Sequence, residues 1–148
     1  MSISKFNIRV YGLALHDGKI LVADEILQGK HVTKLPGGGL EFGEGIIDCL
    51  HREFMEELNA EIENLELFYV TDFFQQSSFD PSHQVICVYY SCKLKKPSIL
   101  KTASKKFDFK VEIERAESFR WQNLNSLTVD DFAFPIDKVV VEKLLKET

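Results

Sequence analysis

Residues 38–60 read GGLEFGEGIIDCLHREFMEELNA, and this stretch predicts a glycine-rich loop that runs into one long helix. Apolar residues recur in it at steps of three and four, at Ile47, Leu50, Phe54 and Leu58. That spacing places them on one face of an α-helix over residues 45–58. We expect this face to pack against a core and to fix the position of everything else on the helix.

Three glutamates share a different face of the same predicted helix. Glu53, Glu56 and Glu57 fall within about 100° of one another around the helix axis. Carboxylates at this spacing repel by roughly 0.2–0.5 kcal/mol per pair, and a divalent cation between them reverses the sign. Oxygen ligands without Cys or His favour Mg²⁺ or Mn²⁺ over Zn²⁺. The competing interpretation is a solvated surface on which Arg52 and Glu56 form an ordinary ion pair.

The spacing of the whole stretch resembles the Nudix box of the Nudix hydrolase superfamily. That box runs Gly, five residues, Glu, seven residues, Arg-Glu, an aliphatic residue, one residue, Glu-Glu, one residue, Gly and an aliphatic residue. Six of its seven fixed positions are filled in this sequence, by Gly38, Glu44, Arg52, Glu53, Glu56 and Glu57. The box covers residues 38–60, and the rest of the chain resembles the family too, in the strands before the box, in Arg120-Trp121 followed by Asn123-Leu124 and Leu127, and in the terminal helix.

Three positions depart from the box. Asn59 replaces the final Gly, and Asn is the residue other than Gly that best tolerates the left-handed conformation expected at a helix end. Phe54 and Ala60 replace the two aliphatic residues, which changes the packing. We therefore expect the carboxylate face to be kept.

The resemblance implies a Nudix fold of the α/β (α+β) class, which is an α/β/α sandwich around a central mixed β-sheet. It also implies Mg²⁺- or Mn²⁺-dependent hydrolysis of the diphosphate linkage in a nucleoside diphosphate derivative. The implied metal ligands are Glu53, Glu56, Glu57 and the carbonyl of Gly38. Arg52 is then expected to orient a carboxylate through its fixed fork, and Glu44 to assist where the loop meets the helix.

The resemblance leaves the general base open. Glu56 is the preferred choice and Glu53 an alternative, but members of the family also recruit a Glu from a later loop. Three glutamates lie in that part of this chain: Glu112, Glu114 and Glu117. Glu41, in the loop before the helix, is either a further ligand or a solvated residue.

The remainder of the sequence predicts a single domain over residues 1–148 that is rich in strands. Runs of β-branched and aromatic residues predict strands at 6–15, 19–24, 32–35, 65–74, 84–94, 109–113 and 118–121. The first two flank Asp17 and Gly18, a pair typical of a tight hairpin turn. Pro135 opens a predicted helix over 135–147. This order of elements predicts a mixed sheet with helices on both faces.

Two features outside the helix concern the substrate. Phe73, Phe74 and Phe79 offer rings on which a base could stack, and His83 could touch the substrate, although core packing explains such aromatics as well. Seven lysines in residues 93–110 predict a hairpin excursion that covers the substrate or keeps the loop soluble. Nothing in the sequence separates a nucleoside triphosphate from a nucleotide sugar, ADP-ribose or a dinucleoside polyphosphate.

The composition limits partners and location. The 148 residues carry a net charge of −5, which disfavours a stable DNA partner. Three cysteines without CxxC spacing indicate a reducing, cytoplasmic setting. No window approaches the ~20 apolar residues that span a bilayer, so we expect no membrane partner. The expected partner is a small nucleotide derivative, and a homodimer is one option.

Two other functions stay open on the sequence alone. One is a Nudix-like nucleotide-binding regulatory domain without turnover, although such a domain has no need of a complete metal set. The other is RNA-end decapping, which the negative net charge disfavours unless the lysine segment guides RNA.

Overall fold

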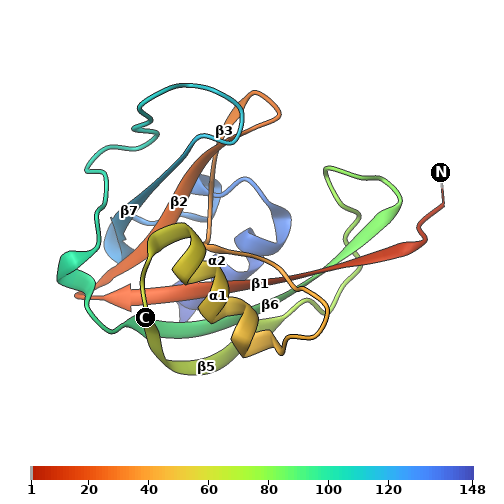
Figure 1. Ribbon diagram of the computed structural model, residues 1–148, viewed down its shortest axis with the longest axis horizontal. Helices are drawn as coiled ribbons and strands as arrows, with labels where there is room; N and C mark the ends of the chain where they lie inside the picture. Colours follow the sequence, from red (N-terminus) through yellow and green to blue (C-terminus); the bar gives the residue numbers. More distant parts are fainter. Residues whose placement is uncertain (1) are drawn as a thin grey trace.

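The computed structural model describes residues 2–148, in which seven strands form a sheet between two α-helices (Figure 1). The strands are β1 (Lys5–His16), β2 (Lys19–Leu27), β3 (Lys30–Lys34), β4 (Gly37–Gly39), β5 (Ile62–Val70), β6 (His83–Leu94) and β7 (Glu117–Asn123). The helices are α1 (Ile46–Leu58) and α2 (Pro135–Lys146), with short 3₁₀ turns at Pro97–Ile99, Leu124–Ser126 and Val129–Asp131. Neither α-helix of this described part has the length and apolar character that crossing a membrane requires.

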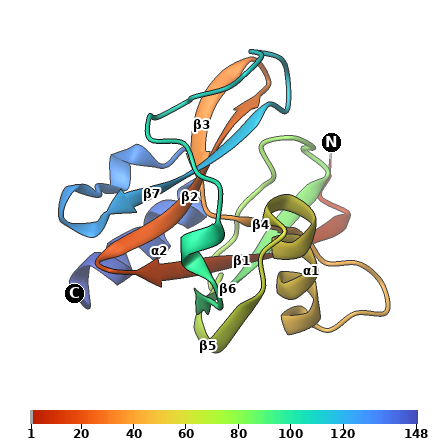
Figure 2. The same ribbon diagram turned by 60° about the vertical axis from the view of Figure 1, so that its left-hand side comes forward.

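The sheet is mixed and follows the strand order β3-β2-β1-β6-β5, with β4 paired to β1 and β7 paired to β2. β1 and β6 run parallel, from Lys5 opposite His83 to Ala14 opposite Cys92, and the other pairs are antiparallel. β1 pairs with β2 only at Leu15 and His16. The sheet therefore divides into two parts that share the end of β1 and turn away from each other (Figure 2).

The turn between β1 and β2 has the geometry that the sequence predicts. Asp17 and Gly18 have φ angles of 48° and 71°. Two-residue hairpin turns of type I′ require such positive values at both positions. The predicted hairpin is confirmed.

Two apolar layers hold the helices on opposite faces of the sheet. Alternate residues of β1 serve both layers, because successive side chains of a strand point to opposite faces. Val10 and Ala14 pack with Leu50 and Phe54 of α1, whereas Leu13 packs with the buried face of α2. Figure 1 shows α1 in front of the sheet and α2 behind it. The predicted α/β/α sandwich is thus confirmed.

The ends of α1 follow from its flanking residues. Gly45 precedes the helix and donates its N–H to Asp48 Oδ2 at 3.1 Å. Asn59 follows the helix with φ 50° and ψ 41°, and its N–H donates to the Met55 carbonyl at 3.0 Å. The left-handed Asn that replaces the final Gly of the box is confirmed.

Replacing Asn59 by Ala is expected to lower the free energy of unfolding by about 1 kcal/mol, because Ala lacks the short polar side chain whose local hydrogen bonds let Asn adopt the left-handed conformation. Gly has no Cβ and adopts that conformation freely, so Asn59→Gly is expected to match the wild type or exceed it slightly. Urea denaturation measures both. Equal stability of the Ala and Gly variants contradicts the conformational role of Asn59.

The buried face of α1 is narrower than the apolar pattern predicts. Cys49, Leu50 and Phe54 are buried, but Ile47 is 45% exposed. Cys49 lies on the side of Leu50 away from Ile47, so the centre of the buried face shifts and Ile47 is left at its margin. The prediction that Ile47 is buried is wrong.

The predicted strand over 109–113 is wrong. Val111 and Ile113 are each 61% exposed in a loop. β2 already pairs with β3 and β7, so it offers no free edge there. The predicted hairpin over 93–110 is wrong as well, because β6 pairs with β1 and β5 while β7 pairs with β2. Residues 95–116 instead connect the two parts of the sheet.

Candidate active site

Arg52 of α1 ties the glycine-rich loop to the helix. Its Nε donates to Glu44 Oε2 at 3.0 Å and its Nη2 to Glu44 Oε1 at 2.7 Å, a two-point pair that the lysine ammonium lacks the geometry to form. Nη2 also donates to the Gly39 carbonyl at 2.9 Å. The Arg52 hydrogen bonds, with one from the Glu41 N–H, lower the pKa of Glu44 to about 2. The loop is therefore fixed just before α1 begins.

The same guanidinium gathers further carboxylates. Its Nη1 donates to Glu53 Oε1 at 2.9 Å and to Glu56 Oε2 at 3.2 Å, and lies 3.3 Å from Glu41 Oε1. The side chain of Glu53 is 12% exposed, whereas that of Glu56 is 58% exposed. With Glu44, four carboxylates face one cation, so this surface keeps a surplus of negative charge.

Replacing Arg52 by Lys is expected to lower stability most at neutral pH. A carboxyl whose folded pKa is depressed contributes stability above its unfolded pKa of about 4.3 and loses that contribution as the pH falls toward the folded value. The Arg52–Glu44 contribution should therefore fade between pH ~4.5 and ~2. Urea midpoints at pH 7 and pH 3 measure it: the gap between wild type and Arg52→Lys should shrink at pH 3. An unchanged gap contradicts the assignment.

β4 carries glycine where Glu53 lies against it. A Cβ on Gly38 would stand 2.5 Å from the carboxyl carbon and Oε1 of Glu53, a distance that atoms of a side chain and a Cβ do not tolerate. The strand has little freedom to retreat, because Gly38 pairs with Val10 of β1. Glycine at this position therefore gives the Glu53 carboxylate its place, between β4 and Arg52.

A second acidic group, Glu57, lies beside Glu53 and is partly buried. Glu57 Oε2 is buried and has no hydrogen-bond partner among the described residues. Burial, with the nearby charge of Glu117, raises the pKa of Glu57 to about 8, against the opposing effect of Lys34. β7 pairs with β2 and so carries Glu117 to this place, where burial raises the pKa of Glu117 to about 7.

The donor set fits a hard divalent cation. All the acidic groups offer oxygen, the ligand atom of Mg²⁺ and Mn²⁺, and the buried, unpaired Oε2 of Glu57 is the kind of acceptor that a bound ion satisfies. Within residues 2–148 no three Asp, Glu, His or Cys groups are arranged so that they could hold a metal ion as they stand. Arg52 draws Glu53 and Glu56 toward itself, so those two carboxylates must turn to join Glu57 around an ion.

Of the three later glutamates, the structure brings Glu117 to this face and leaves the other two apart. Glu112 lies 2.8 Å from Nε2 of His31 on β3. Glu114 accepts hydrogen bonds from the N–H groups of Gln28 and Gly29, in the turn between β2 and β3. The lysine-rich segment 93–110 precedes these glutamates and leads into the connection between β6 and β7. In that connection the N–H of Phe107 donates to Oδ2 of the buried Asp24 at 3.0 Å.

A cavity of about 320 Å³ lies between β1, β6 and the start of α2. Phe79 and Phe134 stand on one side of it with ring centroids 6.0 Å apart. Asp137 of α2 is buried in its wall and accepts a hydrogen bond from the Tyr89 hydroxyl. Burial raises the pKa of Asp137 to about 6. Aromatic side chains combined with polar and charged groups in the wall of a concave site suit the binding of a small polar ligand.

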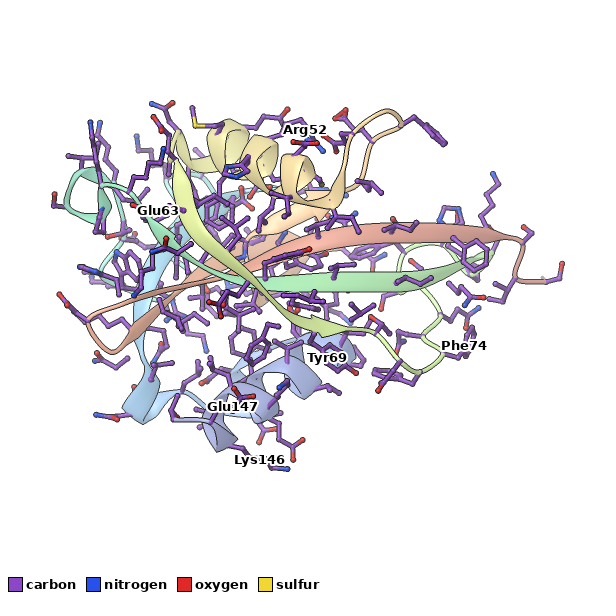
Figure 3. The ribbon with its side chains drawn as sticks, turned by 90° about the horizontal axis from the view of Figure 1, so that it is seen from below. Arg52, Glu63, Tyr69, Phe74, Lys146 and Glu147 are labelled. Carbon is purple, nitrogen blue, oxygen red and sulfur yellow. The ribbon has the colours of Figure 1, made fainter. Side chains whose placement is uncertain are left out.

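The predicted substrate residues divide at this cavity. His83 lines it, whereas Phe73 and Phe74 do not. β5 ends at Val70, before the predicted strand end, so both phenylalanines lie in the loop that follows. Figure 3 shows Phe74 in that loop, well away from Arg52. Phe79 of the same loop does line the cavity.

The sequence analysis did not identify the charged residues that lie between the cavity and α1. Lys34 of β3 lines the cavity, and its Nζ lies 3.1 Å from Oε1 of Glu25 on β2. Arg9 of β1 lines it too. The available signal was a charged residue inside an otherwise apolar strand, as in VADEIL for Glu25. Such a residue is rarely buried without a partner or a ligand.

The fold and this face together define an α/β/α sandwich that carries an arginine-anchored, acidic helix beside a glycine-rich strand. A family model for the NUDIX domain matches residues 5–144, and the chain belongs to that family. This confirms the superfamily that the box predicted.

Solved structures of the family share the fold at low sequence identity. A NUDIX hydrolase from Nitrosomonas europaea matches with a TM-score of 0.72 and 18% identity, over 97% of this chain and 72% of that chain. A MutT NUDIX hydrolase from Burkholderia pseudomallei gives 0.65 and 20%, over 95% and 99%. An ADP-ribose pyrophosphatase from Streptococcus suis gives 0.62 and 16%, over 95% and 90%.

Proposed function

We propose that this protein hydrolyses the diphosphate linkage of a nucleoside diphosphate derivative, with Mg²⁺ or Mn²⁺ as cofactor. The observation that carries the proposal is the carboxylate face of α1, where Glu57 Oε2 is buried without a hydrogen bond from the described residues. Unsatisfied anionic oxygens in a protein interior are costly unless a cation compensates them. Family membership supports the same reaction class.

The residues of the face take separate roles in this proposal. Glu53, Glu56, Glu57 and the carbonyl of Gly38 would hold the ion. A bound ion of this kind polarises phosphoryl oxygens and lowers the pKa of a coordinated water. Arg52 orients Glu53 and Glu56 by the hydrogen bonds that it donates to both. Glu44 in turn fixes Arg52.

Glu56 is our choice for the residue that accepts a proton from the attacking water. Two carboxylates of α1, those of Glu53 and Glu56, accept hydrogen bonds from Nη1 of Arg52. Glu56 is the exposed one of the two, so a water can reach the oxygen that Arg52 leaves free. Proton acceptance requires such direct hydrogen-bond reach. Glu117 is the alternative that the structure brings to the same face.

The cavity supports a nucleotide derivative as substrate. Its volume of about 320 Å³ and its aromatic pair suit a base and sugar. Arg9 and Lys34 stand where the cavity approaches the acidic face, so the phosphates of a bound nucleotide would extend toward that face. Solved relatives carry names that differ in substrate, among them ADP-ribose pyrophosphatase and UDP-X diphosphatase.

A substrate panel tests the proposal directly. Nucleoside triphosphates, nucleotide sugars and ADP-ribose are incubated with the protein and Mg²⁺ or Mn²⁺, and the products are identified by mass spectrometry. We expect at least one substrate to yield a nucleoside monophosphate and its partner phosphate, and EDTA to abolish the reaction. Metal-dependent binding without any product would instead favour a regulatory domain.

A further inference from the structure

Arg9 differs from the other arginines of the chain in its partners. Arg52 pairs with Glu44, Arg120 with the buried Asp24 at 2.7 Å, and Arg115 with Glu25 at 3.5 Å. Among the described residues the Arg9 guanidinium donates instead to a neutral group, from Nε to the Tyr11 hydroxyl at 2.6 Å. Its remaining N–H donors have no carboxylate at hydrogen-bond distance within residues 2–148, although the charge of Glu53 acts on the guanidinium from further away.

Arg9 lies on the wall of the cavity and is partly buried there. Tyr11 holds the guanidinium in place: the Arg9 carbon Cζ lies 5.7 Å from the centre of the Tyr11 ring, and the ring packs 5.4 Å from that of Tyr89. A partly buried guanidinium with free N–H donors is a site at which an anion in the cavity would bind.

The position of Arg9 on β1 indicates where that anion would lie. β4 pairs with β1 so that Gly39 stands opposite Arg9 and Gly38 opposite Val10. A Cβ on Gly39 would lie 3.5 Å from Nη1 of Arg9, and one on Gly38 would touch Glu53. The guanidinium therefore sits next to the strand that cradles the acidic face, between that face and the cavity.

Lys34 is a weaker candidate for the same anion. It also lines the cavity, but its ammonium lies 3.1 Å from Oε1 of Glu25 and is already compensated. A guanidinium also offers parallel N–H donors that match two phosphoryl oxygens, which an ammonium does not.

We propose that Arg9 binds the phosphate group attached directly to the nucleoside, with the N–H groups that Tyr11 leaves free. This inference rests on the proposed function, because it places the nucleoside in the cavity and the diphosphate toward α1. Arg9 then acts as a binding residue that anchors the end of the diphosphate nearest the sugar. Tyr11 acts as its positioning residue.

The test compares the affinities of nucleoside 5′-monophosphates with those of the matching nucleosides, in EDTA, by calorimetry. The four common ribonucleosides and their monophosphates serve as probes. For at least one base we expect the wild type to bind the monophosphate roughly tenfold tighter or more than the nucleoside, as charge-assisted hydrogen bonds allow. Arg9→Gln should lose most of that ratio and keep its affinity for the nucleoside within about twofold.

Three variants separate binding from structure. Arg9→Lys keeps the charge and should retain part of the ratio. Tyr11→Phe keeps the ring and loses the hydroxyl, so the ratio should fall partway. Lys5→Gln, on the exposed start of β1 and outside the cavity, should leave the ratio unchanged.

The inference is overturned if Arg9→Gln leaves the ratio unchanged, or if Arg9→Gln lowers the affinities for the monophosphate and the nucleoside equally. It is also overturned if the wild type binds no monophosphate more tightly than the matching nucleoside. The proposed function fails differently: it fails if the wild type turns over no substrate with metal, and the binding ratio is measured without metal or turnover.

Discussion

Replacing Glu57 by Gln is expected to lower kcat/KM by roughly 100-fold or more while the fold is kept. The substitution preserves size and removes the anionic oxygens, one of which is buried and unpaired among the described residues. Without metal the variant should be more stable than the wild type at neutral pH, because burial raises the pKa of Glu57 to about 8 and Gln has no carboxyl group that must be kept protonated in the fold. Steady-state kinetics on the best substrate and urea denaturation in EDTA measure the two effects.

A matched variant shows whether the loss belongs to the acidic face. Glu63→Gln makes the same chemical change on an exposed side chain of β5 (Figure 3), and it should leave both activity and metal dependence unchanged. Full activity in Glu57→Gln would refute the assignment of Glu57 as a ligand.

Replacing Gly38 by Ala is expected to reduce activity by a similar factor, because the new methyl group displaces the Glu53 carboxylate. A separation of 2.5 Å between the added Cβ and that carboxylate leaves no room for both groups, and a shift of about 1 Å in a catalytic group costs on the order of 100-fold. Glu53 keeps its charge in this variant, so the loss reports position alone. Steady-state kinetics and the Mn²⁺ affinity of the variant measure it.

Gly39→Ala is the control for this prediction. It adds the same methyl group one residue further along β4, where the nearest atom lies 3.5 Å away, an ordinary contact. It should keep at least roughly a third of the wild-type activity, because a contact at that distance is close to the optimal separation of nonbonded atoms. Equal loss in the two variants would mean that β4 tolerates no side chain at all and that Glu53 is not the cause.

Local features of the fold could be predicted from the sequence because neighbouring residues determine them. The turn at Asp17 and Gly18 and the left-handed Asn59 both depend on backbone conformations that few residues tolerate. The strand predicted over 109–113 failed for a non-local reason. Its β-branched residues have strand propensity, but β2 already has partners on its edges.

The candidate site was predictable where it lies on one helix. Glu53, Glu56 and Glu57 share a face by helical geometry alone, and the box spacing adds Gly38, which the sheet brings against Glu53. The cavity was not predictable in this way. It is assembled from β1, β6, the start of α2 and a loop, so that no single stretch of sequence carries its pattern.

The presence of a divalent ion on the acidic face of α1 is the central claim. Crystals grown with Mn²⁺ and a non-hydrolysable nucleoside diphosphate analogue test it through anomalous diffraction at the manganese edge. We predict a peak bound by Glu53, Glu56 and Glu57 and shared with the diphosphate oxygens. A map in which the analogue is bound, and in which these three side chains carry no manganese and point into bulk solvent, would contradict the account.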